Sequence, residues 1–226
     1  MTNTTTPPDS IVLHGFWRSS AAFRVRVTLQ LKGLPFTERL VNLEAGEQSS
    51  PAYLAVNPQG VVPTLLIPGH PALTQSMAIM EFLEELHPSP AILPKGANDR
   101  AFVRSLASLL VSDTHPLITP RVRKQALDRF GASNEAWRGW QTHWFHTGLQ
   151  VFESRIEAAG GSGAFCVGDA PGMADICLAS IFAVMEGLGI ELPSQVARCE
   201  RIVANTRQVA AFAQSAPFLQ PGAPSR

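Results

Sequence analysis

The stretch from residue 11 to residue 33 constrains the fold more than any other part of the chain. A short apolar run, Ile11 to Leu13, precedes two small hydroxyl residues, Ser19 and Ser20, and a segment that closes at Lys32-Gly33. This order is typical of a β-strand, a turn and an α-helix. Between residues 23 and 31, which lead up to Lys32-Gly33, every second residue is apolar, and this period by itself favours a strand. We nevertheless expect a helix, because a Ser start and a Lys-Gly stop suit one, and because parallel strands need a crossover of this length.

The start of this helix is a candidate anion-binding site. The first backbone N–H groups of a helix have no partner inside it, and the helix dipole adds partial positive charge there. The hydroxyls of Ser19 and Ser20 can donate hydrogen bonds to an anion at this point. A simpler interpretation is that one serine only caps the helix, and the sequence leaves both interpretations open.

Three further elements complete the first half of the chain. Residues 35–41 are expected to form a second strand, and residues 65–74 an antiparallel hairpin. Pro63 stands just before the hairpin, where a missing N–H is tolerated in a sheet. A helix with apolar residues at i, i+3, i+4 and i+7 then begins at Gln75-Ser76 and ends before Pro88.

A short Pro-rich segment after this helix is the expected domain boundary. Residues 1–87 would form an α/β domain, and residues 98–226 an all-helical domain. The central helix of the second domain is expected at residues 176–188, which are apolar nearly all round and are followed by Gly189. Other helices are expected around residues 102–110, 145–156 and 195–205.

Composition argues against several classes of protein. The formal net charge is +0, so no basic surface points to nucleic acid. No apolar run reaches the ~20 residues that cross a membrane, and the N-terminus lacks the order of a signal peptide. Three widely spaced cysteines favour a reducing, cytoplasmic compartment over disulfides. His143 and His146 lie among tryptophans with no carboxylate in register, so no metal site is expected.

These elements, in this order, resemble a cytosolic glutathione transferase, and the likeness covers nearly the whole chain. Within that superfamily the chain is most similar to the zeta class, which includes maleylacetoacetate isomerase and the maleylpyruvate isomerases. The double Ser followed by Arg24-Val25-Arg26 is the part that points to the zeta class. The motifs general to the superfamily are Val62-Pro63-Thr64, Gln75-Ser76-Met77-Ala78-Ile79 and Ala174-Asp175.

The resemblance implies a thioredoxin-like domain followed by an all-helical domain, assembled as a homodimer. It implies that glutathione is the cofactor. A cis Val62–Pro63 bond would present the Val62 backbone to the cysteinyl part of glutathione as an added strand. Gln75 and Ser76 would bind the γ-glutamyl carboxylate. The other residues implied near glutathione are Ser19, Ser20, Arg24, Gln48 and His115.

The resemblance also implies a reaction in which the glutathione thiolate is the nucleophile. A free thiol with a pKa of about 8.5 is mostly protonated at neutral pH, and only the thiolate reacts well. Lowering this pKa by about two units needs roughly 2.7 kcal/mol, which one hydroxyl donor and a helix N-terminus can supply. Ser19 and Ser20 are the catalytic candidates, and Ser19 is favoured because the family usually assigns the role to the first Ser. Addition to a maleyl double bond, rotation and expulsion of the thiol would then isomerise the substrate without consuming glutathione.

The substrate is expected to be a small electrophile or dicarboxylate, with Arg18, Arg24 and Arg121 as candidate cations. Two departures from the zeta pattern leave an alternative open. Ala21 stands where a Cys usually follows the double Ser, and Gly187 lies in the stretch where the family usually has an Arg. The alternative is a transferase that conjugates or dehalogenates small electrophiles, or a non-catalytic glutathione-binding protein.

Some charged residues of these motifs are expected to stabilise the fold. Arg24 and Arg26 stand two apart and cannot share one helix face, so one of them is expected to make a surface or interdomain ion pair. Asp175 is expected to cap the central helix of the second domain.

Overall fold

A computed structural model describes residues 10–161 and 163–224 of the chain. The structure divides into two compact units. The first comprises the described residues of Met1–Ala91 and Ala210–Arg226, and the second comprises Ile92–Val209.

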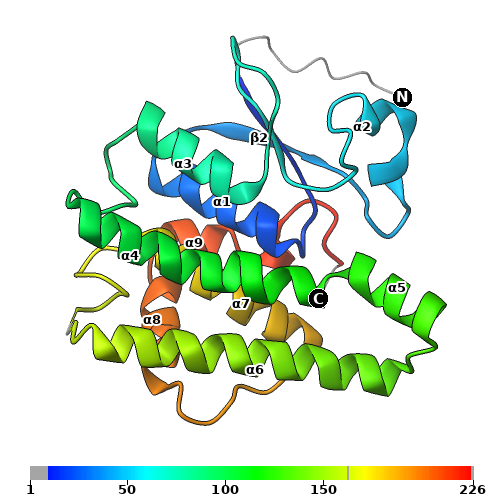
Figure 1. Cartoon of the computed structure of the whole chain (residues 1–226). Coiled ribbons are helices and arrows are strands. Elements are labelled where there is room, and N and C mark those ends of the chain that lie inside the picture. The colour runs from blue at the N-terminus through cyan, green and yellow to red at the C-terminus, as the bar shows by residue number, and fades with distance from the viewer. Residues whose placement is uncertain (1–9, 162, 225–226) are drawn as a thin grey trace. The chain divides into compact units, whose positions relative to one another are not determined.

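The first unit, whose β2, α1 and α3 are labelled in Figure 1, is built on a four-stranded sheet in the order β2-β1-β3-β4. The central strand β1 runs parallel to β2 and antiparallel to β3, and β3 pairs antiparallel with β4, so the predicted strand pair and hairpin are confirmed. The strands are β1 (Ile11–Gly15), β2 (Phe36–Leu40), β3 (Thr64–Leu66) and β4 (Leu73–Thr74).

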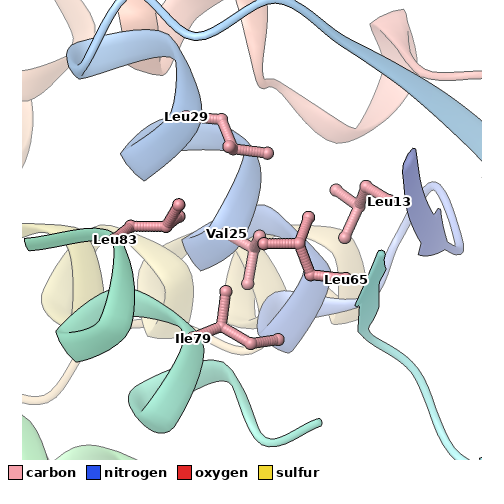
Figure 2. Close-up of a cluster of buried hydrophobic side chains, with 6 residues drawn as sticks. All are labelled: Leu13, Val25, Leu29, Leu65, Ile79 and Leu83. Carbon is pink, nitrogen blue, oxygen red and sulfur yellow. The ribbon is translucent and has the colours of Figure 1, made fainter. Parts of the chain in front are cut away.

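Two helices pack together on one face of this sheet. The first, α1 (Ser20–Leu31), connects the parallel strands, and α3 (Ser76–Leu86) follows β4, so both helices are formed where the sequence predicted them. Figure 2 shows side chains of β1, β3, α1 and α3 pointing toward one another in a fully buried cluster. Burying each of these side chains contributes about 1.5–3 kcal/mol, which makes the cluster the main support of the first unit. Its members are Leu13, Val25, Leu29, Leu65, Ile79 and Leu83.

A smaller buried cluster lies around the long connection between β2 and β3. This connection contains the 3₁₀ turn η1 (Glu47–Ser49) and the short helix α2 (Pro51–Leu54). Tyr53 of α2 packs with three apolar residues from other parts of the unit, and these are Phe16, Val41 and Val62. The cluster therefore fixes α2 close to both the end of β1 and the start of β3.

The last segment of the chain also belongs to the first unit. It contains α9 (Ala210–Gln214) and the 3₁₀ turn η4 (Pro217–Leu219). The ring of Phe212 meets that of Phe23 on α1, with centroids 6.5 Å apart, and the ring of Phe218 meets that of Trp17 at 5.3 Å. The sequence assigned residues 98–226 to the helical domain, whereas these aromatic contacts hold the described residues from 210 onward on the first unit.

The second unit is helical, as predicted. Its central helix, α7, is buried nearly all round and ends at Gly189, whose φ of 63° places it in the left-handed region that suits glycine. Its elements are α4 (Ala97–Ser108), the π-helical segment η2 (Leu109–Thr114), the 3₁₀ turn η3 (His115–Ile118), α5 (Pro120–Phe130), α6 (Asn134–Ala158), α7 (Met173–Leu188) and α8 (Ala197–Arg207).

The start of α7 is held by Asp175, as the sequence predicted. Its carboxylate accepts hydrogen bonds from the backbone N–H of Gly172 at 2.8 Å and from that of Cys166 at 2.7 Å. The loop before α7 is therefore tied to the first turn of the helix. In the part of the chain that the structure describes, every helix is too short or too polar to span a lipid bilayer.

Candidate active site

Three chain connections of the first unit meet at one edge of its sheet. The pairing register places His14, near the end of β1, opposite Thr64, and Thr64 opposite Thr74 at the end of β4. The residues that follow β1, precede β3 and follow β4 therefore gather at this edge. They include Ser19, Val62, Pro63, Gln75 and Ser76, which the sequence singled out from three separate motifs.

Ser19 is the N-cap of α1. Its backbone is extended, with φ −71° and ψ 115°, and its Oγ accepts the N–H of Ala22 at 3.2 Å. The capping interpretation is therefore correct for Ser19. It does not exclude catalysis, because a hydroxyl accepts through its lone pairs while its own O–H remains a donor. Ser19 is half-buried, whereas Ser20 is buried as the first residue of the helix.

Both arginines of the zeta motif are buried. Arg24 and Arg26 are each 1% exposed. Arg26 pairs with the mostly buried Glu38 of the neighbouring strand β2, so it does not make the surface or interdomain ion pair expected of one of the two arginines. For Arg24 this expectation stays a prediction. A helix covered on nearly every side can bury charged residues on two of its faces if each finds partners.

Ser76 begins α3 and lies directly against Arg24. The Nε of Arg24 donates to the Oγ of Ser76 at 3.0 Å, and Ser76 is only 5% exposed. The buried guanidinium orients the hydroxyl and adds positive charge behind it, beside the N–H groups of the helix N-terminus. This arrangement suits a carboxylate, which accepts hydrogen bonds only.

Gln75, just before α3, has a strained backbone. Its φ of 67° with ψ of 111° is rare for a residue other than glycine, and such a conformation costs about 1–3 kcal/mol. Its side-chain Nε2 donates to the Oε1 of Gln59 at 2.8 Å. Strain of this kind persists where the surrounding structure fixes it, and it occurs preferentially at functional sites.

The peptide bond between Val62 and Pro63 is cis, as the resemblance implied. Pairing of β3 with its neighbours begins at Thr64, so the backbone of Val62 lies just beyond the ladder. Tyr53 and Asn57 hold this stretch, because the Tyr53 hydroxyl and the Asn57 Nδ2 both donate to the carbonyl of Val61, at 2.7 and 2.8 Å. A peptide backbone can therefore add to this segment without reordering it.

Gln48 approaches the same segment from η1. A Cβ placed on Gly60 would lie 3.1 Å from the carbonyl oxygen of Gln48, so the two backbones are close. No donor among the described residues reaches the buried Oε1 of Gln48. A buried acceptor without a partner costs about 1–3 kcal/mol, and an N–H group of a bound peptide would remove this cost.

Arg18 lies on the surface beside these residues. Its Nη2 is 3.0 Å from the Oε1 of Glu44, in an ion pair that is 56% exposed on both sides. Its guanidinium also lies over the rings of Phe16 and Trp17, 5.6 and 5.7 Å from their centroids. An exposed ion pair contributes at most about 1 kcal/mol, so Arg18 can exchange Glu44 for a substrate carboxylate at little cost.

His115 and Arg121 belong to the second unit. His115 begins η3 and is half-buried, and Arg121 is exposed in the first turn of α5. The structure thus brings together the predicted site residues of the first unit, while the roles of these two residues stay predictions.

Comparison with known proteins identifies the family. Residues 18–86 match the family model described as the glutathione S-transferase N-terminal domain. Over 215 residues the chain is 39% identical to the maleylacetoacetate isomerase of Pseudomonas aeruginosa, which covers 94% of this chain and 99% of the relative. The chain belongs to the zeta-class glutathione transferase family.

Two solved structures of zeta-class relatives resemble this one throughout. The maleylacetoacetate isomerase of Methylobacterium extorquens AM1, with malonate and glutathione bound, is 41% identical and has a TM-score of 0.90, covering 95% of this chain and 100% of that one. The holo structure of a bacterial maleylpyruvate isomerase of the zeta class is 33% identical, also with a TM-score of 0.90, covering 94% and 100%.

The cysteines of this zeta-class chain are unsuited to nucleophilic chemistry. All three are free and buried. Burial raises the pKa of the Cys166 thiol well above its ordinary value, and it raises the pKa of Cys199 as well. Since the thiolate is the reactive form, a nucleophilic sulfur at this site has to come from a bound molecule.

Sequence reasoning missed the partners that hold the zeta-class motif in place. Glu38, Tyr53 and Asn57 were not singled out, although they support the residues around Ser19 and Val62. A usable signal existed for one of them. An arginine within an apolar helix needs a buried acceptor, and Glu38 is the charged residue of the next strand that faces inward.

Proposed function

We propose that this chain is a glutathione-dependent enzyme that isomerises a maleyl compound of the maleylacetoacetate or maleylpyruvate type from cis to trans. The observation that carries the proposal is the convergence of Ser19, Val62 and Ser76 at one sheet edge. These residues offer a hydroxyl donor, an open backbone edge and a carboxylate site within one unit. The names of the zeta-class relatives agree with this chemistry.

Glutathione fits the donors and acceptors of this edge. Ser76 and the N-terminus of α3 would hold its γ-glutamyl carboxylate, with Gln75 beside them. The backbone of Val62 would pair with the cysteinyl residue, and the unpaired Oε1 of Gln48 would accept one of its N–H groups. We propose that His115 of the second unit contributes to the same site.

The hydroxyl of Ser19 would keep the cofactor sulfur ionised. Its lone pair already accepts the Ala22 N–H, and its own O–H remains able to donate. The N-terminus of α1 adds favourable potential at the same place. Ser20 is buried in the first turn and is the second candidate. Bound glutathione supplies a thiolate that adds reversibly to the maleyl double bond, so that rotation can occur and the cofactor is released unchanged.

The carboxylates of a small dicarboxylic substrate need cations. Arg18 is exposed and weakly paired, so it can turn toward such a carboxylate. Arg24 is fully buried and already bonded to Ser76, so it acts on glutathione and not directly on the substrate. Arg121 is the candidate from the second unit.

We further propose that the enzyme is a cytoplasmic homodimer. Three free cysteines without a disulfide fit a reducing compartment. The dimer is supported by the resemblance to the zeta class, and light scattering coupled to size-exclusion chromatography tests it. A monomer at micromolar concentration would contradict it.

One observation favours a second function, conjugation or dehalogenation of small electrophiles. Gly187 stands where the family usually carries an arginine, and a Cβ placed on Gly187 meets no atom within 4 Å. The charge that would hold a second carboxylate is therefore absent from that position. A less charged substrate would not need it.

A substrate comparison separates these functions. The ultraviolet loss of maleylacetoacetate is followed with glutathione, without it, and with S-methylglutathione, which binds but has no thiol. The same protein is then given glutathione with α-halo acids and with chloronitrobenzene. We expect isomerisation that requires the free thiol and consumes no glutathione. Conjugation without isomerisation would favour the second function, and tight glutathione binding with neither reaction would indicate a non-catalytic protein.

A further inference from the structure

The pair formed by Arg26 and Glu38 does more than neutralise a buried charge. The Nε and Nη2 of Arg26 donate to the two carboxylate oxygens of Glu38 at 2.7 and 2.8 Å, a bidentate arrangement that fixes the plane of the guanidinium. The two side chains are only 1% and 7% exposed. The orientation of Arg26 is therefore set by β2, although Arg26 itself lies on α1.

The same guanidinium reaches the turn between β1 and α1. Its Nη2 donates to the carbonyl oxygen of Phe16 at 2.7 Å, and its Nη1 lies 3.5 Å from the carbonyl oxygen of Trp17. The carbonyl of Phe16 also accepts the backbone N–H of Ser19 at 3.0 Å. One oxygen atom thus connects the buried cation to the backbone of the proposed catalytic serine.

The chain leaves room for this contact. A Cβ placed on Gly15, the last residue of β1, would lie 2.2 Å from the Oε1 of Glu38. Gly15 is therefore needed for space and not for an unusual φ. A lysine in place of Arg26 would lack the planar fork that serves Glu38 and the Phe16 carbonyl together.

We infer that Arg26, held by Glu38, is a positioning residue that fixes the turn before Ser19 so that the Ser19 hydroxyl is aimed at the cofactor sulfur. The inference rests on the proposed glutathione chemistry. Arg26 touches neither cofactor nor substrate in this role, since its donors are occupied by Glu38 and the turn. Its effect on the sulfur is exerted through the backbone of Ser19.

A matched control exists in the same unit. Lys32 and Glu84 form a second buried ion pair, 2.8 Å long, with side chains 0% and 5% exposed. Lys32 also donates to a backbone carbonyl, that of His87 at 2.6 Å. This pair resembles the first in burial and bonding, but it joins the far end of α1 to the end of α3. The substitutions Glu38→Gln and Glu84→Gln therefore each remove one negative charge from a buried ion pair of similar exposure.

Three measurements are made on both variants and on the wild type. They are the pKa of the bound glutathione thiol from its ultraviolet thiolate absorbance, the separate kcat and KM for glutathione, and the melting temperature. For Glu38→Gln we expect the thiol pKa to rise by about one unit, so that kcat falls about threefold at pH 7 and about tenfold well below the thiol pKa, with KM for glutathione unchanged. We expect both variants to lower the melting temperature by a similar amount. Glu84→Gln should leave the thiol pKa and kcat unchanged.

A fourth measurement does not depend on glutathione. Hydrogen exchange of the Ser19 amide, which donates to Phe16, should accelerate at least tenfold in Glu38→Gln and stay as in the wild type in Glu84→Gln. Equal behaviour of the two variants in exchange and in thiol pKa would overturn the inference. If the wild type itself does not ionise glutathione, the proposed function fails, and the exchange result alone then decides whether the pair fixes the turn. Glu38→Asp, which keeps the charge, replaces Glu38→Gln in all measurements if the latter does not fold.

Discussion

Ser19 is predicted to perform two tasks with one hydroxyl, and substitutions can separate them. Its Oγ accepts the Ala22 N–H at 3.2 Å, so loss of the oxygen removes the N-cap of α1. Such a loss costs about 1 kcal/mol, which for a chain of this size lowers the melting temperature by about 2–4 °C. Loss of the O–H also removes the proposed donor to the thiolate. A hydrogen bond to a charged group contributes about 1.5–3 kcal/mol, so the thiol pKa should rise by about one to two units.

Three variants give three different expected outcomes. Ser19→Ala should lose both tasks, with a lower melting temperature and a rate near neutral pH that falls about 3- to 25-fold. Ser19→Asp should keep the stability, since Asp caps as well as Ser, and should lose the rate, since an ionised carboxylate cannot donate and repels a thiolate. Ser19→Thr should keep most of both.

The assay is the titration of bound glutathione together with thermal unfolding of the same samples. A Ser19→Ala variant that loses stability but binds glutathione with an unchanged thiol pKa would refute the reasoning. Ser19 would then be a cap only. Ser20→Ala, measured in the same way, would decide whether the neighbouring serine supplies the donor.

Other predictions concern the stability of both units. Burial raises the pKa of the Asp175 carboxyl above its ordinary value, so the folded state binds its proton more tightly than the unfolded state does. The contribution of this group is therefore greatest below the unfolded pKa and is lost as pH rises through the folded pKa. Denaturant unfolding should show this dependence in the wild type and not in Asp175→Asn. This variant should also lose about 1–3 kcal/mol, because the amide nitrogen that replaces one carboxylate oxygen cannot accept a backbone N–H. Gly148→Ala should destabilise the chain by about 1–3 kcal/mol, because the added Cβ would lie 2.2 Å from the Oγ1 of Thr114, whereas Gly139→Ala on the same helix meets no atom within 4 Å and should stabilise it by about 0.5–1 kcal/mol. Phe218→Ala should cost about 0.5–1.5 kcal/mol by removing a ring contact with Trp17 in the β1–α1 turn. Thermal unfolding measures the effects of Gly148→Ala, Gly139→Ala and Phe218→Ala.

The sequence predicted those parts of the site that local chemistry determines. Ser19 caps a helix, Pro63 directly precedes a strand and Ser76 opens α3, and each is marked by its immediate neighbours. The convergence of these residues at one edge then follows from the order of the strands.

The features that could not be predicted depend on distant parts of the chain. The apolar residues of α1 alternate as in a strand, yet most of its residues are buried. The spacing of its apolar residues therefore does not show which side of the helix is buried. Arg26 finds Glu38 on β2. Thr28 satisfies its hydroxyl within the helix, by donating to the carbonyl of Arg24 at 2.8 Å. Only the fold shows that these polar groups have partners and can be enclosed.

The return of the chain's end to the first unit has a consequence for biosynthesis. Phe212, which packs on α1 beside the sheet, leaves the ribosome after all the strands and after the whole second unit. A nascent chain that has already emerged as far as α8 therefore carries an α1 with part of its apolar surface still open to water. Resistance of the amino-terminal unit to protease should therefore appear only after the segment from residue 210 to residue 219 has emerged, which makes the docking of this segment a late step in folding.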